Sequence, residues 1–299
     1  MFVSSIESGL TTYLKSLKKS LTLAIAAGFV VVTSPVRALE VRLTPENPKQ
    51  GDTISVTIKT DRPGEKPTVS MKQRSYPVFS SNNYGDSYRA LIPTSPLDQS
   101  GKLSIRVTGE GETKNFSVWL SPRSFPTQRI RISGRGSGSA TKLELDRVRA
   151  FKKLVTSQKF WQGKFLRPNA GRVSTVFGVR RYYNGVFAKN YYHRGVDYAS
   201  GHGSPVITPA AGRVALVGRE AGGFKVHGNT VGIDHGQGVL SIFLHLSRID
   251  VREGQLVKPG QRIGAVGSTG ASTGPHLHWG LYVHGVAVDP VPWRFEGID

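Results

Sequence analysis

Two histidines stand two residues apart near the C-terminus of this 299-residue chain, in the stretch Ser272–Gly280 (STGPHLHWG). The residues that follow are mostly β-favouring, so the sequence predicts a strand here rather than a helix. Side chains alternate along a strand, so His276 and His278 project from one face while Leu277 enters the core. Two imidazoles on one face are typical of a metal site, and equally of histidines that line a wet sheet face.

A second cluster of metal-binding residue types lies upstream, in Tyr191–Tyr198 (YYHRGVDY). His193 and Asp197 are four residues apart, a spacing that puts both side chains on one face of either a helix or an extended segment. Two neutral imidazoles and one carboxylate are a ligand set that suits zinc, and three protein ligands leave a fourth position open, as in catalytic sites. Because the chain has no cysteine, a closed thiolate site and a cysteine nucleophile are both excluded.

The pattern H-x-x-x-D followed at a distance by H-x-H resembles the lysostaphin/LytM-type zinc metalloendopeptidases, which cut peptide bonds in bacterial cell-wall peptidoglycan. The resemblance continues, in the order of that family, through Gly228–Gly236 (GNTVGIDHG), Ser241–Leu246 (SIFLHL) and Val257–Gly264 (VKPGQRIG). It covers roughly residues 166 to 293. It implies a LytM-like catalytic domain with the duplicated hybrid motif.

The resemblance also implies the roles of individual residues: His193, Asp197 and His278 as ligands of Zn²⁺, and His245 and His276 as catalytic residues. Bound zinc lowers the pKa of water from nearly 16 toward about 7 and polarises the scissile carbonyl. His245 and His276 are then expected to take up a proton and stabilise the oxyanion, with their separate roles left open. Phe243 stands where the family's Y-x-H-L motif has tyrosine, so that hydroxyl is missing.

The fold class predicted from the sequence is mainly β, because 35 glycines and 17 prolines indicate many turns and short strands. Alternating segments such as Thr53–Ile58 predict a small immunoglobulin-like sandwich over residues 39–122. Residues 123–164 are expected to be a linker, glycine- and serine-rich at 131–140, followed by an amphipathic helix from Thr141 to about Ser157. This helix is expected to pack between domains, although a binding role stays open. The peptidase domain then covers residues 165–299.

Within that last domain the sequence predicts an antiparallel β-sheet with one solvent-facing side, on which a cleft is built. Asn184-Gly185 is a strong hairpin-turn signal and predicts a loop close to His193. Four histidines beside glycines are expected in exposed loops: His202, His227, His235 and His284. His245 instead lies in an apolar run and is expected on the strand face of Ser241 and Phe243. Without the family resemblance, this position favours a hydrogen-bonded structural histidine.

Residues 1–38 are predicted to be an export signal. Lys15, Lys18 and Lys19 precede a 12-residue apolar run, and small residues at Val36 and Ala38 match a cleavage site before Leu39. Such a run is too short to cross a bilayer core as a helix, so a permanent transmembrane helix is the weaker interpretation. The alternative to a cleaved signal is an uncleaved anchor. Either way the chain is expected to act outside the cytoplasm, in the periplasm or at the cell wall.

The net charge of +20 indicates attraction to an anionic cell-wall or membrane surface. No nucleic-acid partner is expected, since the basic residues are scattered and form no recognised motif. The expected partners are peptidoglycan peptides, and the oligomeric state is open. Two alternatives to a zinc endopeptidase are a catalytically silent LytM-fold regulator of cell-wall amidases and a wall-binding adhesin built on the N-terminal sandwich. The bond that is cut, D-alanyl to a diamino acid or glycyl to glycine, is also open.

Overall fold

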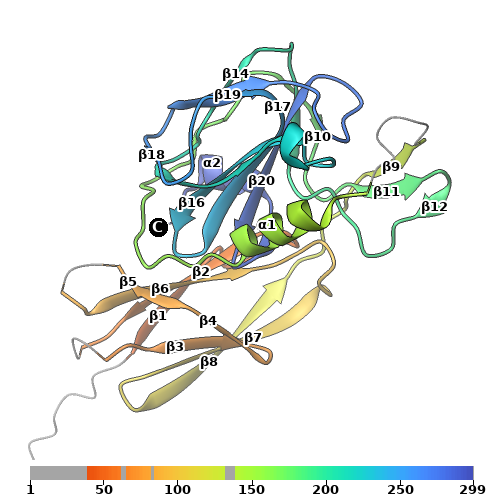
Figure 1. Ribbon diagram of the computed structural model, residues 1–299. Coiled ribbons are helices and arrows are strands. Elements are labelled where there is room, and N and C mark those ends of the chain that lie inside the picture. Colours follow the sequence, from red (N-terminus) through yellow and green to blue (C-terminus); the bar gives the residue numbers. More distant parts are fainter. Residues whose placement is uncertain (1–38, 62–64, 82–83, 132–138, 299) are drawn as a thin grey trace, which may run out of the picture. The chain divides into compact units, whose positions relative to one another are not determined.

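The computed structural model describes residues 39–61, 65–81, 84–131 and 139–298 (Figure 1). The predicted export signal lies outside the described residues, as does most of the predicted linker at 131–140. Within the described part of the chain, no helix is long and apolar enough to span a membrane. The predicted fold class is confirmed: the protein is mainly β, with antiparallel sheets and two α-helices among the described residues.

The N-terminal region forms two four-stranded sheets, ordered β1-β2-β6-β5 and β4-β3-β7-β8. Alternation is clear in β7, where Leu103, Ile105 and Val107 are buried and the residues between them face outward. These side chains and those of β2 share one hydrophobic cluster. The immunoglobulin-like topology stays a prediction. The strands are β1 (Glu40–Thr44), β2 (Thr53–Lys59), β3 (Thr68–Met71), β4 (Arg74–Tyr76), β5 (Val78–Ser80), β6 (Ser87–Pro93), β7 (Gly101–Gly109) and β8 (Glu112–Leu120).

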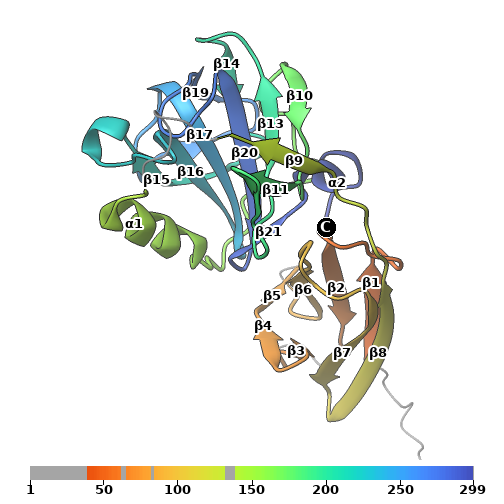
Figure 2. The same cartoon turned by 90° about the vertical axis from the view of Figure 1, so that its right-hand side faces the viewer.

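A small sheet ordered β12-β11-β9 combines β9 (Thr127–Ile130) with β11 (Arg180–Tyr183) and β12 (Val186–Phe187). The hairpin predicted at Asn184-Gly185 is confirmed: both residues have positive φ, 48° and 88°, and Tyr183 pairs with Val186. Strand β9 was not expected from the sequence, and it runs parallel to β11 (Figure 2).

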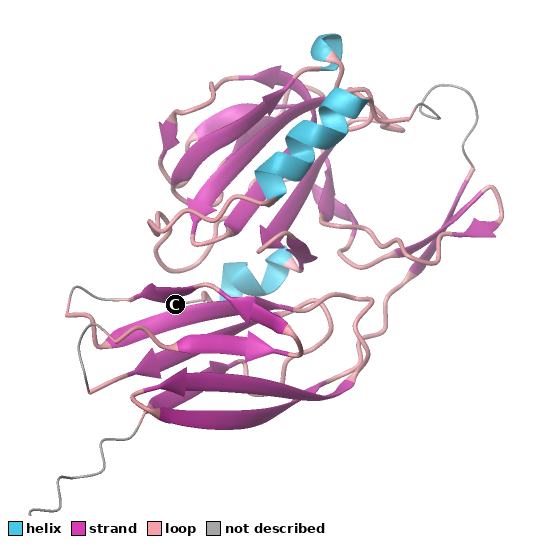
Figure 3. Ribbon diagram, turned by 60° about the horizontal axis from the view of Figure 1, so that its bottom comes forward, coloured by secondary structure: helices cyan, strands magenta, loops and turns pink. Residues whose placement is uncertain are grey.

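Helix α1 (Lys142–Lys152) is shorter than predicted and ends five residues before Ser157. Its buried residues are Glu144, Val148 and Phe151, whereas Leu143 and Leu145 are about half exposed. The Phe151 ring lies where a side chain at Gly232 would stand, 2.8 Å from that ideal Cβ position. The helix therefore lies directly on the large C-terminal sheet (Figure 3).

The C-terminal sheet has the order β10-β13-β20-β17-β16-β15-β18, and every pair on this path is antiparallel. The strands of this sheet are β10 (Arg172–Thr175), β13 (Val196–Ala199), β14 (Pro205–Ile207), β15 (Gly212–Gly218), β16 (Asn229–Gly236), β17 (Val239–Ile249), β18 (Leu256–Val257), β19 (Arg262–Val266), β20 (His276–Val283) and β21 (Val286–Val288). Two short helices lie in the same part of the chain, the 3-10 helix η1 (Glu220–Gly222) and α2 (Pro290–Phe295).

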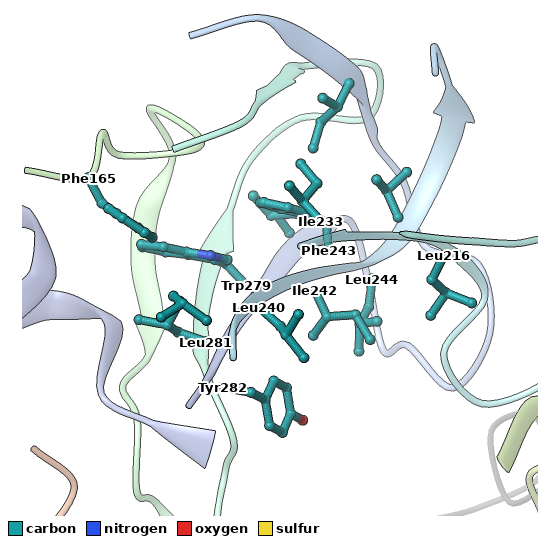
Figure 4. Packing of buried hydrophobic residues seen from close by; sticks show 14 of the residues in the cluster. Phe165, Leu216, Ile233, Leu240, Ile242, Phe243, Leu244, Trp279, Leu281 and Tyr282 are labelled. Carbon is teal, nitrogen blue, oxygen red and sulfur yellow. The ribbon is translucent and has the colours of Figure 1, made fainter. Parts of the chain in front are cut away.

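The central strands of this sheet are buried on both faces. In β17, the eight consecutive residues from Val239 to Leu246 are all buried. The prediction of one solvent-facing side is therefore wrong for these strands, and the Phe151 side chain of α1 covers part of one surface at Gly232. Figure 4 shows part of the resulting cluster around Phe243 and Trp279, which are cross-strand partners.

Two of the four histidines expected in exposed loops are buried. His235 is 0% exposed in β16, with Nδ1 2.8 Å from the carbonyl of Ala211 and Nε2 2.9 Å from Oγ of Ser241. His284 is 9% exposed. A neighbouring glycine marks a turn at the end of a strand, and it does not report whether that turn is covered by other parts of the chain.

Burial lowers the pKa of His235 to about 4 from a usual value of 6.5. Between those values the unfolded chain binds more protons, so stability falls as the pH decreases from 6.5 toward 4. Between about pH 7.5 and about pH 5, the titration of His235 is expected to lower the free energy of unfolding by about 2 kcal/mol. Urea unfolding of the metal-free protein should show a smaller loss for His235→Gln than for wild type. Equal losses in the two proteins would contradict this assignment.

Candidate metal and catalytic site

Register between two strands brings the first pair of candidate ligands together. In the antiparallel pairing of β13 with β20, Asp197 stands directly opposite His278. Residues in such a pair point to the same face with Cβ atoms about 5 Å apart. His193 lies four residues before Asp197, outside the strand. It is held there by hydrogen bonds from its own N–H to Val179 O (2.9 Å) and from the Gly178 N–H to its carbonyl (2.9 Å).

The three side chains converge on one point. His193 Nε2 lies 3.0 Å from Asp197 Oδ1 and 3.0 Å from His278 Nδ1, and His278 Nδ1 lies 2.8 Å from Asp197 Oδ1. All three residues are buried, with 2%, 6% and 9% of their surface exposed. Among the described residues, this trio is the one group of histidine, aspartate or glutamate side chains whose ligand atoms are arranged to hold a metal ion.

The contacts of the His193 ring favour a cation at this point. The ring nitrogen Nδ1 of His193 is 2.9 Å from the carbonyl of Val176. A neutral imidazole that donates from Nδ1 has no proton on Nε2, so Nε2 faces a carboxylate oxygen and a second ring nitrogen with nothing to donate. Two nitrogen lone pairs and a carboxylate are the donors that zinc takes, and a carbonyl-bound second nitrogen is the usual support of a ligating histidine. The donor set therefore fits zinc.

Electrostatics keep Asp197 and His278 in the protonation states that a metal needs. Burial acts to raise the pKa of Asp197, but the adjacent imidazoles of His193 and His278 outweigh it and hold that pKa well below its usual range. Burial lowers the pKa of His278 to about 4, although Asp197 opposes this shift. At neutral pH the site thus offers a charged carboxylate and a neutral His278 ring.

The two predicted catalytic histidines lie side by side. His276 is the first residue of β20 and His245 lies in β17, with ring centroids 4.8 Å apart. His276 Nδ1 is 2.8 Å from the carbonyl of Gly274, and His245 Nδ1 is 2.8 Å from the carbonyl of Thr269. A neutral ring that donates from Nδ1 leaves its Nε2 as a proton acceptor. Burial, reinforced by His276, lowers the pKa of His245 to about 3.

A β-bulge brings His245 to His276. Pairing of β16 with β17 advances from Val231↔Phe243 to Asn229↔Leu246, so β17 carries one extra residue between these pairs. His245 has a φ of 63°, in the left-handed region that few non-glycine residues adopt. Bulges of this kind re-aim side chains beside active sites.

The expectation that His245 shares a face with Ser241 and Phe243 is therefore wrong. Phe243 is paired with Trp279 on the Leu277 side of β20, whereas the His245 ring contacts His276. The regular alternation of side chains along β17 ends at the bulge.

Three further residues support this arrangement and were not identified from the sequence as parts of the site: Glu144, His227 and Thr269. Glu144 is fully buried although it lies in the first turn of α1. The pattern Thr141-x-x-Glu144 is a capping-box signal, which marks a helix start but does not reveal a second role of the carboxylate.

Comparison with known proteins finds similarity to one peptidase family over part of the chain. The model of peptidase family M23 matches residues 191–290. The chain is similar to the peptidoglycan DD-endopeptidase ShyA of Vibrio cholerae, with 35% identity over 187 residues, which are 62% of this chain and 40% of that protein. It is also similar to the DD-carboxypeptidase/endopeptidase Mpg of Neisseria meningitidis, with 42% identity over 120 residues, which are 40% of this chain and 26% of that protein. The chain spans less than half the length of either relative.

A solved structure has the same architecture. The crystal structure of a putative peptidase M23 from Pseudomonas aeruginosa matches with a TM-score of 0.60 and 24% identity, covering 84% of this chain and 96% of that chain. At this identity the likeness shows the fold alone.

Proposed function

Since residues 191–290 match the model of peptidase family M23, a family of metallopeptidases, we propose that the protein is a zinc-dependent endopeptidase that hydrolyses peptide bonds of peptidoglycan. The observation that carries this proposal is the convergence of His193 Nε2, Asp197 Oδ1 and His278 Nδ1 to within 3.0 Å of one another. These three atoms would hold the zinc, and three protein ligands leave one coordination position for the reaction.

Zinc in this place supplies a Lewis acid that polarises the scissile carbonyl and makes water a nucleophile near neutral pH. The protein's own groups do the rest. His245 and His276 each donate a hydrogen bond from Nδ1 to a backbone carbonyl. The Nε2 of either ring is then free to accept the proton of the attacking water. The ring that has taken up the proton then stabilises the developing oxyanion and returns the proton to the leaving amine. The alternative of a catalytically silent regulator is not favoured, because all five of these side chains are present.

The names of the relatives and the net charge support the proposed substrate class. ShyA is named a peptidoglycan DD-endopeptidase, which favours the bond between D-alanine and a diamino acid for this protein as well. A net charge of +20 would draw the protein to an anionic wall or membrane surface. Together with the export signal proposed at residues 1–38, this favours action in the periplasm or cell wall, with Leu39 as the mature N-terminus.

The test is digestion of purified sacculi of defined chemistry, with mass spectrometry of the released peptides. We expect cross-linked muropeptides to be converted to monomers by cleavage at D-alanine. A chelator should abolish this activity, and zinc should restore it. A zinc-loaded protein that leaves all sacculi intact would overturn the proposal. If that protein activated a purified amidase, the regulator alternative would replace it.

A further inference from the structure

Helix α1 carries a carboxylate in the stripe of residues that it buries. Glu144, Val148 and Phe151 follow one another at i, i+4 and i+7, and they form the buried face of the helix. Glu144 is 0% exposed. Its part in the capping box needs only one long contact, from the Thr141 N–H at 3.3 Å, so the helix start does not account for its burial.

The Glu144 carboxylate binds the loop that precedes β16. It accepts hydrogen bonds from the backbone N–H groups of Lys225 (3.0 Å), Val226 (3.1 and 3.2 Å) and His227 (2.6 Å). The His227 ring nitrogen Nδ1 lies 2.6 Å from the same carboxylate. Three successive N–H groups aimed at one carboxylate form an anion-binding nest, which Glu144 fills from a distant part of the chain.

This loop in turn holds the backbone of His245 directly and its ring through Thr269. The His245 N–H donates to the carbonyl of His227 at 3.0 Å. Its Nδ1 donates to the carbonyl of Thr269 at 2.8 Å. The segment that contains Thr269 is attached to the same loop, because the N–H of Ala271 donates to Val226 O at 2.9 Å. Thr269 Oγ1 also accepts from the N–H of Asn229, the first residue of β16, at 2.9 Å.

His245 depends on such support more than a residue in a regular strand does. It occupies the left-handed region with a φ of 63° in a β-bulge, a conformation that persists only where the surroundings enforce it. The bulge interrupts the ladder, and the His245 N–H bonds to His227 O, which belongs to the loop.

We propose that Glu144 is a positioning residue: it fixes the loop 225–228 and through it the backbone and ring of His245. The kinetic part of this inference rests on the proposed endopeptidase function, and the structural part does not. Glu144 lies outside the region that the family model matches, 191–290. The segment before the peptidase domain therefore completes the catalytic site. Burial acts to raise the pKa of Glu144, but the hydrogen bonds from His227 and Val226 outweigh it, so the carboxylate is charged at neutral pH.

The central variant is Glu144→Gln, which keeps the size of the side chain and presents an amide to N–H groups that require an acceptor. Asp146→Asn is the matched control, because Asp146 lies on the same helix and pairs with Lys142 and Arg149 at the surface. Hydrogen exchange measured by mass spectrometry on peptides covering 224–229 and 240–247 reports on the loop and on His245. We expect faster exchange in both peptides for Glu144→Gln and wild-type exchange for Asp146→Asn.

The kinetic readout separates positioning from a general loss of structure. Glu144→Gln is expected to lower kcat by on the order of 10-fold or more, with KM and zinc content unchanged. In a His245→Ala background the same change should alter kcat by less than about twofold, because the residue it positions is gone. Equal losses of kcat in both backgrounds, or wild-type exchange and wild-type kcat in Glu144→Gln, would overturn the proposal.

A second variant and a separate readout keep the test decisive. If Glu144→Gln does not fold, Glu144→Asp retains the charge but withdraws the carboxylate by one methylene, and an intermediate loss of protection and of kcat supports the inference. Wild-type values of both in that variant overturn it. If the wild-type protein cleaves no sacculus, the proposed function fails, and the exchange measurement alone decides the role of Glu144.

Discussion

Asp197→Ala is expected to abolish zinc binding and peptidoglycan cleavage together. Asp197 Oδ1 lies within 3.0 Å of a nitrogen of each candidate histidine ligand, and Asp197 is the one carboxylate of the trio. Its removal eliminates a coordinating atom and the negative charge that partly neutralises a dication in a buried site, and water replaces neither. The Lewis acid contributes several kcal/mol to such reactions, so its loss corresponds to about 10³-fold or more in kcat.

Elemental analysis beside sacculus digestion measures both effects in one preparation. His202→Ala is the matched control, since His202 is an exposed histidine of the same domain and is not part of the trio. It should keep wild-type zinc and activity. Full zinc occupancy in Asp197→Ala would refute the ligand assignment, whatever happens to the activity.

The second expected result separates catalysts from ligands. His276→Ala and His245→Ala should each retain zinc and lose on the order of 10²-fold or more in kcat, the scale of a general acid or base. His278→Ala should instead lose zinc and activity together, because His278 Nδ1 is one of the converging atoms. His276 and His278 share a strand face, so this comparison tests which of the two is the ligand.

The double variant of His245 and His276 adds a sharper measurement. Their rings are 4.8 Å apart and each has Nδ1 bound to a backbone carbonyl, so both Nε2 atoms are expected to serve the same water and oxyanion. The combined loss should therefore be much smaller than the product of the single losses. Fully multiplicative effects would show that the two imidazoles act independently, and a metal-free His276→Ala protein would show that His276 is a ligand.

The sequence alone was sufficient to predict those features whose structural determinants are local. The two-residue spacing of His276 and His278 and the extended segment around Asp197 predict side chains on one face, because alternation is a property of any strand. The Asn184-Gly185 turn was predicted because both of its positions need positive φ, which these residue types tolerate. The mainly β class followed from the same short-range signals. The candidate ligands came from residue type, spacing and resemblance, and their binding of zinc stays a prediction.

Tertiary structure alone decided the features that depend on pairing partners far along the chain. The register that puts Asp197 opposite His278 joins segments about 80 residues apart, and no local rule selects it. The bulge at His245 reverses the face that alternation predicts, because its N–H finds an acceptor in a loop rather than in the ladder. The burial of Glu144 and His235 likewise depends on which distant carbonyl and N–H groups surround them. A polar side chain can be buried only where such partners exist, and those partners are assembled by folding.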